Sequence, residues 1–294
     1  MPQIEIAAVL PYFLRLENGD YPSQVGNRSY LLTLQDTSSR ASNRAQEKRT
    51  QVSSIFDGNA TSDDEVQHIK TQEVERLLQQ INRLLRWYRA VTGRATVTEL
   101  PRAEVSPFRF RIVNGEENAS LTWNESILFE ASPLPLESGQ TEQSVTQAVR
   151  NGLAEKNDPA VSTLFLLDAK QASLDGRFRE AVLFCWSAID STFDQKYKAL
   201  AASIIKNKAD YNSFVNFRDA TMRYRMSAGL HFCTGQSLYD KPELWVNLFK
   251  SYTKRNSIIH DGDSAQETDA ELALSVARQI VDFLDTLKPK AKNN

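Results

Sequence analysis

The stretch LLDAKQASLDGRFREAVLFCWSAIDSTF, residues 166–193, decides the fold of the second half of the chain. Its apolar residues recur every three or four positions on both sides of Asp175-Gly176, a spacing typical of amphipathic helices. Glycine ends helices readily because it adopts left-handed backbone conformations, so Gly176 should separate two helices. The stretch predicts a helical hairpin, whose first helix should begin at the cap-like pair Asp158-Pro159.

Further helices are predicted between this hairpin and the C-terminus. The second helix of the hairpin should run to about residue 200, and helical spacing returns over residues 213–232, from Pro242, and from about Thr268. Thr268 and Glu271 have the spacing of a capping box, which predicts the start of the last helix. Five helices with short connections predict an all-α bundle over residues 158–290.

The first part of the chain combines strand and helix patterns. Phe108, Phe110 and Ile112 alternate with arginines and predict a half-buried strand, and similar patterns occur at 4–16, 29–34 and 121–129. One long helix ending at Gly93 is predicted by an apolar stripe of Val74, Leu77, Leu78, Ile81, Leu84, Leu85 and Tyr88. The fold class is therefore predicted to be α+β, with a mixed α/β N-terminal domain and an all-α C-terminal domain.

Polar composition sets the expected domain boundaries. Residues 35–61 are polar enough to predict a mobile loop inside an N-terminal domain of residues 1–140. Pro, Gly, Ser and Gln are frequent over residues 132–157, so residues 141–157 are predicted to be a linker that includes a short helix near 142–153. We expect a sensor or regulatory role for the N-terminal domain.

The bulk composition is that of an ordinary globular protein, with 41% hydrophobic and 24% charged residues. No apolar run approaches the roughly 20 residues needed to span a membrane, and the start of the chain lacks a basic region, so we expect a cytoplasmic protein without a membrane partner. Cys185 and Cys233 lie in apolar helical sequence, which predicts reduced core thiols. Scattered histidines and cysteines and the absence of a glycine-rich phosphate loop predict no metal and no cofactor.

Charge is distributed unevenly along the chain. The net charge is −2, yet the segment from Lys206 to His260 contains nine lysines and arginines against four acidic residues. A local basic patch is typical of a protein that binds a polyanion such as RNA, because lysine and arginine neutralise phosphates. A solvated helix face is the alternative interpretation of the same charges.

The segment KRNSIIHDGD, residues 254–263, contains the candidate catalytic pair Arg255 and His260. Gly262 predicts the end of the helix at about His260, where the negative end of the helix dipole favours a protonated imidazole. Histidine is suited to general acid–base catalysis, and the arginine fork matches phosphate oxygens. The pair is sufficient for attack of the RNA 2′-hydroxyl on its own phosphodiester without a metal ion.

The spacing of the pair imposes a geometric condition. Residues five apart on a regular α-helix differ by about 140° in direction, so Arg255 and His260 of one helix would not share a face. Either the helix unwinds near its end, or two copies of the motif meet in a homodimer. We expect the homodimer.

Two alternatives weigh against a catalytic pair. Arg225 and His231 have a similar spacing within another helical segment, so spacing alone is not specific. Arg255 could instead pair with Asp261 or Asp263, with His260 serving only as a helix-end residue.

The context of Arg255 and His260 resembles the HEPN domain (higher eukaryotes and prokaryotes nucleotide-binding), and is closest to its Apea-like bacterial branch. The resemblance rests on RNSIIHDG after an aromatic helix and before a terminal helix, and on the hairpin of residues 166–193. It covers residues 158–287. The family's motif is an arginine, a polar residue and a histidine four to six positions after the arginine, and Arg255, Asn256 and His260 match all three.

The resemblance implies a dimeric, metal-independent endoribonuclease, often a toxin or an antiviral defence effector. By it, His260 would transfer the proton of the 2′-hydroxyl or of the leaving group, Arg255 would bind the phosphate, and Asn256 would orient one of them. A regulatory partner or trigger is also expected, since an uncontrolled ribonuclease would injure its host. The rival hypothesis is a non-catalytic module that dimerises or binds RNA or a nucleotide.

Overall fold

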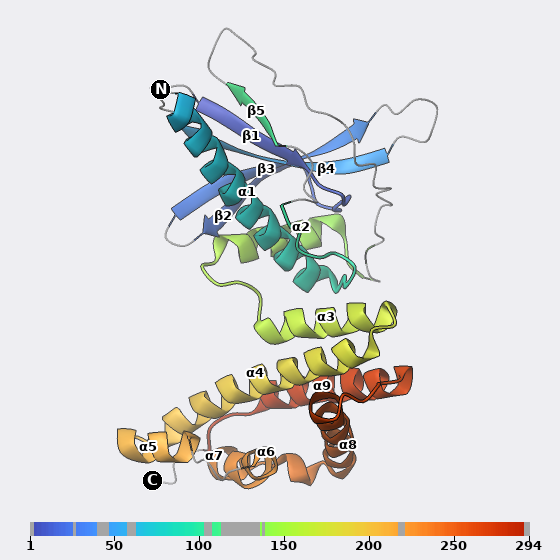
Figure 1. Ribbon diagram of the computed structural model, residues 1–294. Helices are drawn as coiled ribbons and strands as arrows, with labels where there is room; N and C mark the ends of the chain where they lie inside the picture. The colour runs from blue at the N-terminus through green and yellow to red at the C-terminus, as the bar shows by residue number, and fades with distance from the viewer. Residues whose placement is uncertain are drawn as a thin grey trace. The chain divides into compact units, whose positions relative to one another are not determined.

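The computed structural model describes residues 3–25, 28–39, 47–57, 63–102, 108–112, 136, 139–216 and 221–290. The chain divides into two compact units, Met1–Pro159 and Ala160–Asn294. Every described strand belongs to the first unit, and the described part of the second unit is helical (Figure 1). The predicted α+β class is confirmed.

One antiparallel sheet forms the frame of the N-terminal unit. Its strand order is β2-β3-β4-β1-β5, and Ile6 of β1 lies opposite Ser54 of β4 on one side and Phe110 of β5 on the other. The predicted strand at 108–112 is present, whereas the one at 121–129 lies outside the described residues. The strands are β1 (Gln3–Val9), β2 (Gly19–Val25), β3 (Arg28–Ser39), β4 (Glu47–Asp57) and β5 (Arg109–Ile112).

Helix α1 (Asp63–Thr92) lies across one face of this sheet (Figure 1). All seven apolar residues of the predicted stripe are buried in the core of the unit, and Gly93, with φ +66°, follows the last turn. Helix α2 (Glu142–Ala154) packs beside α1 so closely that a Cβ added to Gly152 would lie 2.4 Å from the Trp87 ring. The long-helix prediction is therefore confirmed.

The predicted mobile loop over residues 35–61 is wrong where the structure describes it. Strand β3 continues to Ser39, and β4 occupies Glu47–Asp57 with Val52 fully buried. The hydroxyl of Thr50 is also buried and accepts a hydrogen bond from the Leu14 amide at 2.9 Å. The polar residues that suggested a loop thus include side chains that serve as partners within the sheet layer.

The short helix predicted near 142–153 is confirmed as α2, but the predicted linker over residues 141–157 is wrong, because these residues belong to the N-terminal unit. Thr141 and Ser144 form a capping box at the start of α2, and Val145, Val149 and Leu153 are buried in the N-terminal core. Apolar residues at helical spacing outweigh the loop-like composition of the surrounding segment.

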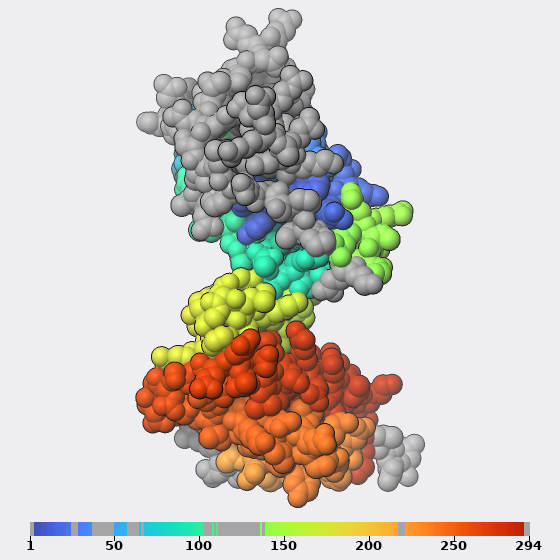
Figure 2. All heavy atoms as spheres, turned by 90° about the vertical axis from the view of Figure 1, so that its right-hand side faces the viewer, coloured from blue at the N-terminus to red at the C-terminus, as the bar shows by residue number. Residues whose placement is uncertain are grey.

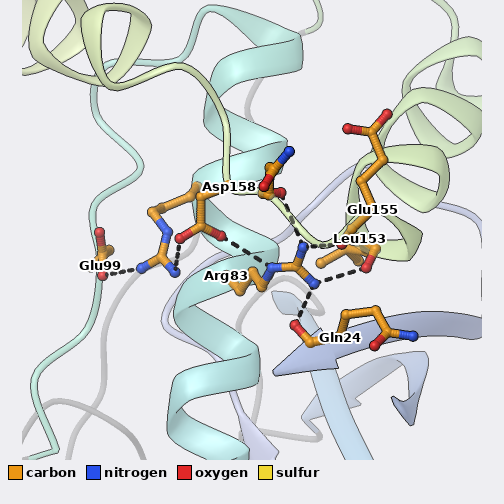
Figure 3. Close-up of polar contacts among 8 residues, drawn as sticks. Gln24, Arg83, Glu99, Leu153, Glu155 and Asp158 are labelled. Atoms are coloured by element: carbon orange, nitrogen blue, oxygen red, sulfur yellow. Dashed lines mark hydrogen bonds and ion pairs between the residues drawn. The ribbon is translucent and has the colours of Figure 1, made fainter. Parts of the chain in front are cut away.

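Arg83, buried on α1, fastens the segment that follows α2 (Figure 3). All five N–H groups of its guanidinium donate hydrogen bonds, and four of the acceptors are backbone carbonyls. The bonds run from Nη1 to the oxygens of Gln24 and Leu153, from Nη2 to those of Glu155 and Asn157, and from Nε to the Asp158 carboxylate.

Asp158 has a different role from the predicted helix cap. Its carboxylate also accepts a hydrogen bond from Arg86 Nη2 at 2.9 Å (Figure 3). Helix α3 begins only at Val161, and its N-cap residue Ala160 offers no side-chain cap. The prediction failed because two arginines of α1 bind the carboxylate.

The C-terminal unit is built around α4 (Phe178–Ile204), which packs against the helices on either side of it in the sequence and against both helices at the C-terminal end. Asp175 and Gly176, with φ +72°, separate α3 from α4 as predicted. The other helices are α3 (Val161–Leu174), α5 (Lys208–Val215), α6 (Met222–Tyr224), α7 (Leu230–Thr234), α8 (Pro242–His260) and α9 (Glu267–Thr286).

The single helix predicted over residues 213–232 is wrong. Helix α5 ends at Val215, residues 217–220 lie outside the description, and α6 leads into a π-helical segment, η1 (Arg225–Gly229), before α7. Gly229 explains the close packing here, because a Cβ at this position would lie 2.8 Å from the Tyr197 hydroxyl oxygen. A short 3₁₀ turn, η2 (Leu238–Asp240), precedes α8.

Helix α8 ends, and helix α9 begins, close to the residues predicted from the sequence. Helix α8 begins at Pro242 and ends at His260, followed by Gly262 with φ +71°. Helix α9 is capped by Gln266 and Asp269 rather than by Thr268 and Glu271, because the reciprocal hydrogen bonds form two residues earlier.

Candidate functional site

Arg255 lies partly buried on α8 and makes one described hydrogen bond, from Nη1 to the Asn256 side-chain oxygen at 3.0 Å. Within the described chain it forms no ion pair with Asp261 or Asp263, the alternative that the sequence left open. Guanidinium carries five N–H donors, so most of this group is available to a ligand.

His260 is exposed at the last residue of α8. The helix stays α-helical through this residue, so the alternative in which it unwinds between Arg255 and His260 is wrong. The two side chains therefore differ by about 140° in direction around one helix. The structure does not bring Arg255 and His260 together within one chain.

Asn256 lies between the directions of Arg255 and His260 around α8. It accepts the hydrogen bond from Arg255, and it precedes His260 by four residues, which places these two about 40° apart around the helix. An amide in this position can orient the guanidinium while remaining on the side of the imidazole.

Arg255 lines a cavity of about 200 Å³ that is open to solvent and lies between three helical segments of the C-terminal unit. Each segment contributes one large side chain and one charged side chain, three or four residues apart. These are Trp186 and Asp190 from α4, Met222 and Arg225 from α6 and η1, and Tyr252 and Arg255 from α8. Figure 2 shows the face of this unit on which residues preceding α8, in orange, adjoin the redder last two helices.

A side-chain hydrogen bond between α4 and α8 fixes the position of Trp186, one of the residues that line the cavity. Trp186 is almost fully buried and donates from Nε1 to the Ser251 hydroxyl at 2.9 Å. Its ring lies 5.1 Å from that of Tyr252, tilted by 57°. The aromatic wall is thus fixed by packing and by a hydrogen bond.

Arg225 and His231 are the second pair in the sequence with the arginine–histidine spacing. In the structure, this pair is related to Arg255 and His260 through the arginines alone. Both Arg225 and Arg255 line the cavity, whereas neither His231 nor His260 is among its described lining residues. His231 is exposed on α7. The two matches therefore share a site through their arginines only.

Asp190 is the acidic residue among the described residues that line this cavity, and it is exposed to solvent. Partial removal from water by the surrounding side chains raises the pKa of its carboxyl, and the positive charge of Arg255 opposes this to a smaller extent. Asp190 and Trp186 were not predicted from the sequence. Their spacing of four residues on α4 was the available signal, but it marks a site only once the partner helices are known.

Thiol and metal chemistry find no support among the described residues. Cys185 and Cys233 are buried free thiols, and burial raises the pKa of Cys185 to about 12 and that of Cys233 to about 11. A thiolate nucleophile is therefore suppressed. No cluster of histidine, cysteine and acidic side chains in the described part of the chain has metal-binding geometry.

Comparison with known proteins returns no match: no family model, no curated protein and no solved structure is similar to this chain. The HEPN resemblance thus has no support outside the residues that suggested it. Among the described helices, none is both long and apolar enough to cross a membrane.

Proposed function

We propose that this chain is a metal-independent endoribonuclease whose active site is completed by a homodimer. The observation that carries the proposal is the arrangement at the end of α8, where exposed His260 follows an Asn256 that is hydrogen-bonded to Arg255. These are the three residues of the HEPN-like motif, and that resemblance also suggests a role as a toxin or antiviral effector.

The chemistry requires no group beyond these side chains and the RNA. The 2′-hydroxyl loses its proton and attacks phosphorus, the bond to the 5′-oxygen breaks, and the leaving oxygen takes up a proton. The products are a 2′,3′-cyclic phosphate and a free 5′-hydroxyl. His260 would transfer a proton, and Arg255 would stabilise the charge on the phosphate oxygens.

Dimerisation follows from the regularity of α8. Because Arg255 and His260 diverge around the helix, one phosphate can meet both only if the second copy supplies one of them. Val246 and Ile259 are large apolar residues of α8 that are 51% and 46% exposed. Ile259 lies next to His260, where an exposed apolar side chain suits an interface between copies.

The test is cleavage of labelled RNA by the full chain in excess chelator. His260→Ala and Arg255→Ala should each abolish cleavage, and mixing the two inactive variants should restore part of it if each supplies what the other lacks. Wild type that leaves RNA intact contradicts the proposal, and two inactive variants that stay inactive when mixed contradict the shared site.

A binding module without catalysis is the second candidate, and one observation favours it. Arg255 faces a cavity that His260 does not line, an arrangement that can hold a phosphate without cutting it. Wild type that binds RNA with no cleavage, and loses binding on Arg255→Ala but not on His260→Ala, would favour this second function.

A further inference from the structure

We propose that the cavity between α4, the α6–η1 segment and α8 binds a phosphoryl anion of a nucleotide unit, with Arg225 as a second phosphate-binding residue beside Arg255. The choice of ligand rests on the RNA-directed function proposed above. The cavity has a volume of about 200 Å³, and its lining includes six side chains from the described part of the chain.

The charges of the cavity favour an anion. Two guanidinium groups from separate helical segments line one small space. A guanidinium group is a planar fork whose geometry matches phosphate oxygens. Of the five N–H groups of Arg255, one is used by Asn256. A phosphate bound between the two groups would be attracted by both of them.

The π-helical segment explains how Arg225 comes to face the cavity. A π turn contains more residues than an α turn and is often found at functional sites. Here it begins at Arg225 and ends at Gly229, where contact with Tyr197 leaves no room for a Cβ. Local backbone irregularity and tight packing thus position a single cationic side chain.

The uncharged half of the cavity suits the rest of a nucleotide. Trp186, Met222 and Tyr252 supply the smaller, apolar part of the lining beside the two arginines, and Trp186 is almost fully buried behind it. Single-stranded RNA is commonly bound by aromatic rings that contact the base or ribose while arginines hold the backbone. The wall distinguishes this cavity from a general basic surface.

The negative charge of Asp190 should affect anion affinity in the opposite direction to the charges of the two arginines. Its carboxylate shares the cavity with both arginines and interacts electrostatically with Arg255. In the absence of ligand it acts as a counter-ion, and on binding it repels the phosphate. Loss of this charge should therefore strengthen anion binding, whereas loss of either arginine should weaken it.

The experiment measures the affinity of the full chain for two probes in chelator, a 2′-O-methylated RNA oligonucleotide and a nucleoside 5′-monophosphate. The methylated oligonucleotide cannot be cut, because it lacks the attacking hydroxyl. Arg225→Gln should weaken oligonucleotide binding about tenfold and reduce its dependence on salt by about 0.7 in the logarithmic slope. Asp190→Asn should strengthen binding about threefold.

Arg223→Gln is the matched control. Arg223 is exposed two residues away, and its guanidinium lies 4.6 Å from the Phe249 ring centre instead of lining the cavity. Its loss should change affinity less than twofold, and Arg225→Lys, which preserves the charge, should retain more affinity than Arg225→Gln.

The results of these binding measurements distinguish failure of the proposed phosphoryl site from failure of the proposed ribonuclease function. Equal effects of Arg225→Gln and Arg223→Gln, or a wild type that binds neither probe, would overturn the phosphoryl site. His260-dependent cleavage of unmodified RNA could still be observed in the first case. A response of the oligonucleotide alone identifies a phosphodiester as the ligand, and a response of both probes identifies a terminal phosphate as well; either result supports the site.

Discussion

Arg83 in the N-terminal unit and Arg255 in the C-terminal unit are two partly or fully buried arginines with opposite states of their guanidinium groups. Arg83 uses all five N–H groups on protein acceptors, four of them backbone carbonyls. Arg255 uses one, on the neighbouring Asn256, and faces a cavity. A saturated guanidinium maintains a fold, whereas an unsaturated one beside a cavity is available to a ligand.

Replacement of Arg83 should have the largest effect on stability. Arg83→Met removes the donor from four backbone carbonyls and from one oxygen of the Asp158 carboxylate, and we expect a loss of about 3–5 kcal/mol in the free energy of unfolding. Urea titration followed by circular dichroism measures it. A loss below about 1 kcal/mol would show that water replaces these bonds and that the saturated state is not structural.

Thiol labelling tests whether the loss of stability caused by Arg83→Met is confined to the N-terminal unit. Both cysteines belong to the C-terminal unit, where burial raises their pKa values to about 12 and 11. They should react slowly at pH 8 in the folded chain and rapidly after unfolding. Arg83→Met should unfold the N-terminal unit at lower urea without an equal increase in labelling.

Gly152→Ala tests the packing around the Arg83 network with a smaller effect. The added Cβ would lie 2.4 Å from the Trp87 ring, and overpacking of this kind costs about 1–3 kcal/mol. Denaturant titration of the variant measures the loss. The control is Asn151→Ala at the exposed neighbouring position, which should stay within about 0.5 kcal/mol of wild type.

Arg255→Met should change stability by less than about 0.5 kcal/mol, because its remaining donors face a cavity and solvent instead of protein acceptors. The same urea titration as for Arg83→Met provides the comparison. A loss of several kcal/mol would show that the two arginines have the same structural role.

Asp190→Asn should give the smallest effect, and one that depends on pH. Because the folded state raises the pKa of this carboxyl, the folded state holds its proton more tightly than the unfolded state, and stability falls as the group ionises. At pH 7 the variant should melt at a slightly higher temperature than wild type. The difference should shrink as pH falls below the ordinary carboxyl range, and a difference that grows there would contradict the assigned direction.

Local patterns predicted much of this structure. The stripe on α1, the break at Gly176 and the end of α8 before Gly262 depend on residues close in sequence, and all three are confirmed. Composition misled where polar residues had partners distant in sequence, as with Thr50 in β4 and Asp158 beside Arg83.

The site was predicted only in part. Arg255, Asn256 and His260 lie on one helix and could be read from their spacing, although the catalytic roles stay predictions. The cavity needed Trp186, Asp190 and Arg225 from segments separated along the chain. Its geometry also depends on a π turn, and helical periodicity at 3.6 residues cannot reveal a local departure from that period.

The π turn at Arg225–Gly229 is a place where the chain can lose a residue without changing the directions of the flanking side chains. A π turn is one residue longer than an α turn, so deletion of one residue such as Ser227 would allow a plain α-helix here. The side chains on either side would keep their relative directions, because both kinds of turn close about one revolution of the helix. The same deletion within the regular helix α8 would rotate the residues before it by about 100° relative to those after it, and would thereby move Tyr252 or Arg255 out of the cavity.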